Sequence, residues 1–495
     1  MRKITQENEQ EQGRKSPVYI YVLLVSAAFL FYNLFFGHIS DNPKLLWGAF
    51  IFLALLLWAY LDVAYVFLAT LFFLPVLIGQ NNYQINIGSF LGSFLPISEL
   101  YIDPFSLASL FLVFLSGIEL LKRIKKLAQA PLFFILSLVI ILELATFVTS
   151  KYKLTGAVFE LYLLAGFMSY FLGYFLLVSK RNYLRLIFTA LFSAIIPSIF
   201  AVYQLASGNY LYEGDSTLGR ITGTFPHSNT YGSFLFIILT IALAASFAIR
   251  KKKPKKEKTE SKNIRIMKWA FIFFMGALLL LTFSRTAWIG FALSVLAIAI
   301  MRPKIRIPIV LFGSLGITVL MFFEKFRDRI FGIFDHYMYD SMYGRYEIWD
   351  MALYAARKKP MMGYGIGSFE EVIREVQGKE TGNVYPHNDT VRFFLEGGLA
   401  GVFSYLLYMA GAIFYAAKSF LKYPKGDETI DFFGTELTVD FKLLGMIPLM
   451  LFAIMVVISM VEAPSMDFVY QIFAWTMLGS WLGMNRKQAV QSKSS

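Results

Sequence analysis

The chain has 495 residues, of which 57% are hydrophobic and 17% aromatic, and its formal net charge is +13 at pH 7. This composition excludes a soluble globular protein and predicts a polytopic helical membrane protein. Runs such as 105–121 and 186–205 are apolar on nearly every face, which is typical of helices covered by lipid. The absence of cysteine excludes disulfides, thiol catalysis and cysteine-based metal sites.

Hydropathy windows of about twenty residues predict about fourteen membrane spans. The predicted spans are residues 17–36, 44–60, 63–79, 102–121, 131–150, 155–178, 184–205, 230–249, 269–283, 287–301, 307–323, 396–417, 441–461 and 468–483. We interpret the first as a retained span and not as a cleaved signal peptide. Its apolar stretch is too long for a signal, and its small residues Ser26, Ala27 and Ala28 lie inside that stretch.

Clusters of lysine and arginine predict the orientation of these spans, because short basic loops stay in the cytoplasm. The clusters are at 122–126, 180–185, 250–268, 302–306, 418–425 and 486–487. All of them fall on one side if the N-terminus is cytoplasmic, so both termini are predicted to be cytoplasmic in a multi-pass protein of the cytoplasmic (inner) membrane. The basic loop 250–268 beside anionic lipid headgroups explains the positive charge, and nucleic-acid binding has little support.

This topology leaves three long segments on the outer side, at 80–101, 207–229 and 324–395. The predicted organisation is a first membrane region (1–323), a large extracytoplasmic loop (324–395), a second membrane region (396–484) and a cytoplasmic tail (485–495). In the large loop, Phe323, Phe326, Ile330 and Phe334 predict a helix on the membrane surface. A second helix is expected at 345–357, and a turn with Gly363, Gly365 and Gly367 ends it.

The four histidines are all predicted on the outer side or at its boundary; they are His38, His227, His336 and His387. Imidazole accepts a proton near neutral pH, so a histidine facing an acceptor hydroxyl is a candidate general base. A histidine in a surface loop is more often inert. His387, however, directly precedes a predicted helix start at Asn388 or Asp389, and such a start can hold an anion. His387 is the candidate base, with Asn388 and His227 as candidate substrate-binding residues.

No nucleotide pool exists outside the cytoplasmic membrane, so the donor of a transferred group there must carry its own leaving group. A polyprenyl diphosphate supplies one, and arginine forks onto two phosphate oxygens while remaining charged. The outward candidates are Arg220, Arg285, Arg345 and Arg392. The alternative for each is contact with lipid headgroups or a carboxylate. For Arg392 the second is favoured, since Asp389 and Glu396 lie at helical spacing.

Carboxylates inside the predicted spans form a separate set. Glu143 and Glu160 lie toward the outer ends of neighbouring spans, where either could pair with an arginine or hold a sugar hydroxyl. Structural pairing is favoured over catalysis, and Glu143 is kept as a candidate substrate-binding residue. No histidine and carboxylate cluster at metal-ligand spacing occurs in the predicted outer loops, so neither a metal nor a cofactor is expected.

Five pieces of the chain occur in the order found in the O-antigen ligase and polymerase family. They are the stretch 223–229, the pair Ser284 and Arg285, the helix start 345–349, the glycine turn 360–369 and the element from His387 to Gly401. The second half of the chain therefore resembles that family. The resemblance implies a helical, GT-C-like membrane fold, although the family more typically has twelve spans.

The resemblance also implies a reaction, the metal-independent, inverting transfer of a glycan from undecaprenyl diphosphate. His387 would take the role of the loop histidine, and Arg220 and Arg285 would bind the diphosphate. The acceptor stays open between a glycan on a second lipid carrier (a polymerase) and another lipid or a protein (a ligase). A transporter of lipid-linked glycans is the alternative from another class, and it would need a charged route across the bilayer. Apart from Glu143, few central membrane charges are available for such a route.

Overall fold

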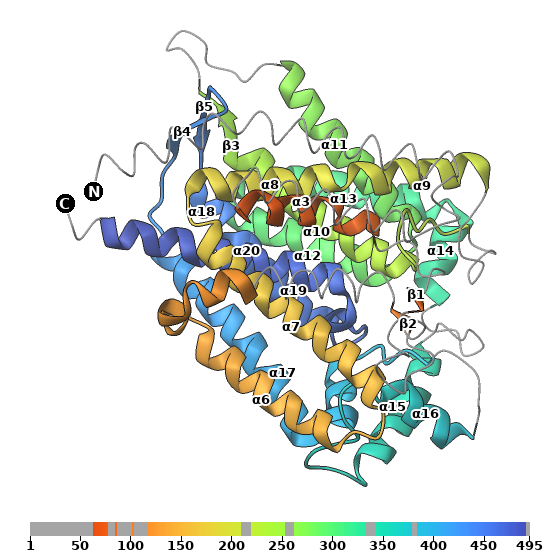
Figure 1. Ribbon diagram of the computed structural model, residues 1–495. Helices are drawn as coiled ribbons and strands as arrows, with labels where there is room; N and C mark the ends of the chain where they lie inside the picture. The colour runs from red at the N-terminus through yellow and green to blue at the C-terminus, as the bar shows by residue number, and fades with distance from the viewer. Residues whose placement is uncertain are drawn as a thin grey trace.

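The computed structural model describes residues 63–77, 85–86, 101–102, 117–208, 219–252, 262–332, 342–378 and 384–491. The predicted spans 17–36 and 44–60, most of 102–121, and the histidines His38 and His336 lie outside these residues. In the described part, 7 helices are long and apolar enough to cross a membrane, and further apolar helices are shorter. The predicted all-α, multi-pass membrane architecture is confirmed (Figure 1).

The described helices follow the predicted spans closely. The longer ones are α3 (Val63–Leu77), α6 (Phe133–Thr149), α7 (Lys153–Leu176), α8 (Lys180–Ser193), α9 (Ile195–Ser207), α10 (Ser228–Ala248), α11 (Lys262–Leu281), α12 (Arg285–Met301), α13 (Arg306–Met321), α17 (Asp389–Lys422), α19 (Met446–Ile458) and α20 (Phe468–Gln491). The shorter ones are α14 (Glu324–Phe331), α15 (Met342–Ala356), α16 (Phe369–Gln377) and α18 (Phe441–Leu444). Single 3-10 turns lie at Ile124–Gln129, Pro303–Ile305 and Pro464–Met466.

Several predicted boundaries were wrong. The span expected at 184–205 consists of two helices, α8 and α9, which meet at Ala194 ahead of Pro197 in the first turn of α9. Part of the basic loop expected at 250–268 is helical, because α11 begins at Lys262. Helix α17 begins at Asp389, as the helix start expected at Asn388 or Asp389 predicted, and it extends beyond both ends of the span expected at 396–417. These differences arise because caps and packing, and not hydropathy, determine where a helix ends.

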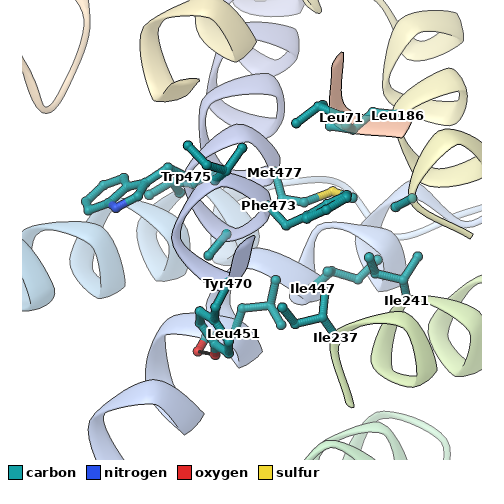
Figure 2. Close-up of a cluster of buried hydrophobic side chains, with 14 of the residues drawn as sticks. Leu71, Leu186, Ile237, Ile241, Ile447, Leu451, Tyr470, Phe473, Trp475 and Met477 are labelled. Atoms are coloured by element: carbon teal, nitrogen blue, oxygen red, sulfur yellow. Dashed lines mark hydrogen bonds between the residues drawn. The ribbon is translucent and has the colours of Figure 1, made fainter. Parts of the chain in front are cut away.

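The core is built around the close pair α7 and α20, which run side by side through the centre of Figure 1. A Cβ atom added to Gly479 of α20 would lie 2.0 Å from the carbonyl oxygen of Tyr170, so a side chain there would separate the two helices. Small residues at such positions let membrane helices approach closely. Two fully buried rings of α20 lie on opposite sides of that helix in Figure 2: Phe473 packs against Phe234 of α10, whereas Trp475 packs against α7, α17 and α19.

Loops predicted to be cytoplasmic gather at one end of the bundle, which we call the basic end. There β4 (Glu428–Phe432) and β5 (Thr435–Val439) form a hairpin that the sequence reading did not predict, and β5 also pairs with β3 (Ile249–Lys251). Cations of β3 and α8 pair with carboxylates at the start of this hairpin. Arg250 lies 2.7 Å from Asp427, and Lys180 pairs with Glu428.

Segments predicted to be outward gather at the opposite end, which we call the site end. Arg220 contacts the turn between α11 and α12, while Arg345 and His387 contact the segment that follows α19. The short strands β1 (Ile85–Asn86) and β2 (Tyr101–Ile102) pair with each other. The predicted division of loops into two sets is thus reproduced in space, one set at each end.

Backbone packing at the site end explains the glycines of the 360–369 turn. Helix α17 is kinked at Gly398, whose φ of 60° and ψ of −148° are accessible to glycine. The turn fills this kink, because Leu399 N donates to Pro360 O at 2.8 Å and a Cβ on Gly363 would lie 2.3 Å from Glu396 O. The turn 360–369 and the first part of α17, which were predicted as separate pieces, therefore pack together as one unit.

Candidate functional site

The segment that carries His387 is held in a fixed shape. His387 has a φ of 49°, in the left-handed region that side chains other than glycine rarely adopt. The next residue, Asn388, caps α17 by accepting a hydrogen bond from Val391 N at 3.0 Å, which confirms the predicted helix start. Trp349 of α15 donates to Pro386 O at 2.8 Å. The unusual backbone of His387 is therefore maintained from both sides.

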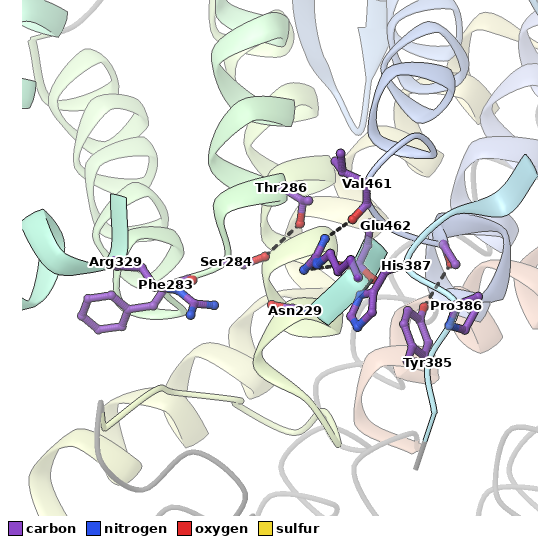
Figure 3. A network of polar contacts seen from close by, with 12 residues as sticks. Asn229, Phe283, Ser284, Thr286, Arg329, Tyr385, Pro386, His387, Val461 and Glu462 are labelled. Carbon is purple, nitrogen blue, oxygen red and sulfur yellow. Dashed lines mark hydrogen bonds and ion pairs between the residues drawn. The ribbon is translucent and has the colours of Figure 1, made fainter. Parts of the chain in front are cut away.

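The imidazole of His387 faces a carboxylate in the segment that follows α19. Its Nδ1 lies 3.1 Å from Oε1 of Glu462, in the segment between α19 and α20 (Figure 3). Arg345 of α15 donates to Val461 O, and its Nη2 lies 3.9 Å from Oε2 of Glu462. The Arg345 and Glu462 side chains are both 9% exposed, against 19% for His387, so the histidine is the most accessible member of the trio.

Arg220 is anchored at the same end by neutral acceptors. Its Nε donates to Thr282 O at 2.9 Å and its Nη2 to Asn229 Oδ1 at 2.7 Å, and the residue is 7% exposed. The charges of Arg220 and Glu462 both act on His227, which therefore lies at the site end as well. Although His227 keeps exposed surface, desolvation of its ring and the charge of Arg220 lower its pKa.

Arg285 begins α12 directly after a strained turn. Phe283 in this turn has a φ of 50°, and Arg329 of α14 donates to its carbonyl oxygen at 2.9 Å. The Phe283 ring also packs against Phe326 of α14 with a centroid separation of 4.8 Å. Helix α14, the helix predicted to lie on the membrane surface, therefore fixes the turn that precedes Arg285. Arg285 itself is half-buried. Figure 3 draws this turn in one view with His387 and Glu462.

The remaining predicted residues form a second, deeper group. Arg392 Nε lies 3.6 Å from Oε2 of Glu396, and both side chains are 4% exposed. Glu143 of α6 accepts a hydrogen bond from Ser404 of α17 and lies within electrostatic range of Arg392. These contacts fit the alternative of structural pairing that the sequence favoured for Arg392 and Glu143. Substrate binding by either one stays a prediction.

Asn388 has a similarly occupied side chain. Besides capping α17, it donates from Nδ2 to Met460 O at 3.0 Å. Both ends of its amide are thus used by the backbone, so any contribution of Asn388 to substrate binding includes holding the loop in place.

Two residues at the site were missed by the sequence reading. Glu462 sits at the predicted outer end of the span 441–461, in a segment too short to be counted among the outer loops. Arg329 was not among the candidate residues, and in the structure it is 8% exposed and donates to Phe283 O. A carboxylate at the outer end of a span is a sequence signal that could have identified Glu462. No such signal marks the hydrogen bond of Arg329 to Phe283 O, since every residue has a backbone carbonyl.

The site end combines a histidine held by a carboxylate with several guanidinium groups. Backbone carbonyl oxygens hold the guanidinium groups of Arg220, Arg329 and Arg345 in place at this end of the bundle. This combination suits a reaction in which a proton is accepted beside a phosphate leaving group. In the described part of the chain, no three His, Asp or Glu side chains gather as a metal site.

The chain is similar in sequence to proteins of glycan synthesis. Residues 270–406 match the family described as O-antigen ligase. A stretch of 250 residues is 24% identical to the exopolysaccharide production protein ExoQ of Rhizobium meliloti (strain 1021), covering 48% of this chain and 56% of that protein. The chain thus spans little more than half the length of this curated relative. The predicted resemblance to the O-antigen ligase and polymerase family is confirmed.

The family match includes some of the candidate residues and leaves others out. Arg285, Arg345 and His387 lie inside 270–406, as do Asn388 and Arg392. Arg220, His227, Glu143 and Glu462 lie outside it. The positions of Arg220 and Glu462 beside the matched residues are therefore known from the fold alone.

Proposed function

We propose that this chain, whose second half resembles the O-antigen ligase family, is a membrane glycosyltransferase that polymerises glycan repeat units carried on undecaprenyl diphosphate. The observation that carries the proposal is the grouping of His387, Glu462 and Arg345 at the same end of a membrane bundle as Arg220 and Arg285. The relative is an exopolysaccharide production protein, which agrees with a polymer as product.

The donor half of the proposed site is made by Arg220 and Arg285. When the glycosidic bond to the lipid carrier breaks, negative charge grows on the diphosphate. A guanidinium binds two phosphate oxygens and remains charged at all physiological pH values. Arg220 donates to a carbonyl of the turn before α12, and Arg285 directly follows this turn, which Arg329 also holds. Both arginines are therefore in position before the donor arrives, as electrostatic stabilisation of a leaving group requires.

The acceptor half of the proposed site is His387. Its ring takes the proton from the acceptor hydroxyl while that oxygen forms a bond to the anomeric carbon. The bond between the anomeric carbon and the diphosphate oxygen breaks in the same displacement, and undecaprenyl diphosphate leaves with the bonding electron pair. A single direct displacement inverts the anomeric configuration, and the proposed step uses neither a metal nor a cofactor.

The orientation of the bundle in the proposal follows from charge. Lysines and arginines concentrate in the loops of the basic end, and such loops remain in the cytoplasm. The site end then faces the extracytoplasmic side of the inner membrane, where lipid-linked repeat units are displayed. The partners proposed are the undecaprenyl diphosphate-linked oligosaccharide, an acceptor glycan and the surrounding membrane lipids.

Transfer by purified protein tests the proposal. The protein in nanodiscs is mixed with an undecaprenyl diphosphate-linked repeat unit in EDTA and without nucleotide, and the product size is followed on a gel. A ladder of lengthening glycans that is missing with His387→Ala supports a polymerase. Transfer that appears only after a second lipid or a protein acceptor is added identifies a ligase instead. Folded protein that is silent in both assays contradicts a glycosyltransferase and favours a transporter of lipid-linked glycans.

A further inference from the structure

We infer that Glu462 is the positioning residue of the proposed base: it accepts a hydrogen bond from Nδ1–H of His387 and so leaves Nε2 as the atom that takes the proton. The inference rests on the proposed function of His387. Glu462 lies outside the family match and was not among the residues expected from the sequence.

The segments that carry His387 and Glu462 are bound to each other along their length. Tyr385 donates to Ala463 O at 3.1 Å, and Asn388 donates to Met460 O at 3.0 Å. Asp389 N donates to Ser459 O at 3.0 Å, one step further along. Glu462 therefore lies opposite His387 within a run of contacts that keep the two segments in register, and the 3.1 Å distance between Oε1 and Nδ1 is a consequence of that register.

The chemistry of the two groups assigns the proton between them. An ionised carboxylate has acceptor oxygens and no proton to give, so the hydrogen bond to Glu462 requires a proton on Nδ1. In neutral imidazole the other nitrogen is then an acceptor, which places the lone pair on Nε2. When Nε2 takes a proton from the acceptor hydroxyl, the carboxylate stabilises the imidazolium that forms, as in other pairs of a carboxylate and a histidine base.

Arg345 completes this arrangement by holding the carboxylate. It bonds to Val461 O, the carbonyl next to Glu462, and its Nη2 lies 3.9 Å from the carboxylate. A buried carboxylate needs a compensating charge, and this guanidinium supplies one. The Tyr385 ring packs edge-on to the imidazole at a centroid distance of 4.9 Å, which further limits rotation of His387.

The tautomer of His387 is directly measurable, independently of activity. The chain has 4 histidines, so protein labelled with ¹⁵N-histidine in lipid gives few NMR signals, and the His387 signal is the one lost in His387→Ala. We expect protonated Nδ1 in the wild-type protein and in Glu462→Asp. In Glu462→Gln the side-chain amide can donate to Nδ1, so we expect a mixture of the two tautomers. An unchanged tautomer in Glu462→Gln overturns the inference.

Kinetics supply the second readout. Glu462→Gln should lower kcat by about 10- to 100-fold while KM for the lipid donor changes by less than about threefold, because correct orientation of the base acts mainly on the chemical step. Glu462→Asp should recover most of the lost rate. The matched control is Glu428→Gln, which removes a carboxylate paired with Lys180 at the basic end.

The outcomes separate this inference from the proposed function. Full activity in Glu462→Gln, with no activity in His387→Ala, overturns the role of Glu462 and leaves His387 as the base. Full activity in His387→Ala overturns the proposed function itself. A Glu462→Gln protein with a lowered melting temperature and equal losses in kcat and donor binding contradicts a positioning role, because it indicates a link that merely holds the loop.

Discussion

The two ends of the helical bundle hold their charged side chains in different ways. At the basic end, cations pair with carboxylates near the surface; Arg181 and Asp431, for example, are 42% and 52% exposed. At the site end, Arg220 and Arg329 are 7% and 8% exposed, and both donate to backbone carbonyls of the turn before α12. This ion pair of the basic end is exposed to water, whereas these two arginines of the site end are buried and fixed to backbone carbonyls.

This difference in how charged side chains are held indicates that the two ends contribute differently to the protein. Exposed ion pairs contribute about 0 to 1 kcal/mol each, so the loss of any one pair at the basic end should change the stability little. The buried guanidinium groups of Arg220 and Arg329 are held in one position by backbone carbonyls, and cations fixed in this way suit the binding of an anionic substrate. The variants below test this contrast, from the largest expected effect to the smallest.

Removing the imidazole should have the largest effect. We expect His387→Ala to lower the transfer rate by about 10²- to 10⁴-fold, the usual contribution of a general base, because no other group at the site replaces the lost proton acceptor in that position. Binding of the lipid donor, measured by fluorescence of a labelled carrier, should remain near the wild-type value. Retention of more than a tenth of the wild-type rate would falsify the assignment of His387.

Replacing the forked cations comes next. Arg285→Lys and Arg220→Lys keep the positive charge but lose the planar fork, so we expect kcat/KM to fall by about 10- to 100-fold in each. Arg181→Lys at the basic end is the matched control and should stay within about twofold of wild type. If all three variants behave alike, the site end has no special dependence on the guanidinium shape and the contrast between the ends is lost.

The packed turn at the site end should control stability. In Gly363→Ala the new Cβ would lie 2.3 Å from Glu396 O at a φ of +62°, so we expect a loss of about 2 to 4 kcal/mol and reduced activity. Gly276→Ala in α11 is the control, because a Cβ there meets nothing within 4 Å. It should leave stability unchanged or slightly higher. Melting temperatures in one detergent compare the two, and equal values contradict the packing described for the turn.

A change at the basic end should have the smallest effect. Asp427→Asn removes the partner of Arg250 in an ion pair whose members are 43% and 49% exposed. We expect a stability change of less than about 1 kcal/mol and an unchanged transfer rate. A large loss of transfer activity here would show that the hairpin of β4 and β5 communicates with the site end, and that the two ends are not independent.

Much of the architecture could be predicted because hydropathy is a local property. The spans 131–150 and 230–249 correspond to α6 (Phe133–Thr149) and α10 (Ser228–Ala248) within a few residues. The cap at Asn388 was also predicted from local chemistry, since an asparagine side chain satisfies the first free N–H groups of a helix. The hairpin of β4 and β5 was missed, because its short strands are set by pairing with β3 and with cations from distant loops.

The sequence by itself determined that this protein is a multi-pass helical membrane protein, and it named His387, Arg220 and Arg285 as candidates. Only the tertiary structure decided what these residues contact. Glu462 and His387 are 75 positions apart and meet because α17 and α19 pack side by side, a relation that no local pattern encodes. Arg220 and Arg329 are held by backbone carbonyls, which every residue has, so the sequence carries no mark of those contacts.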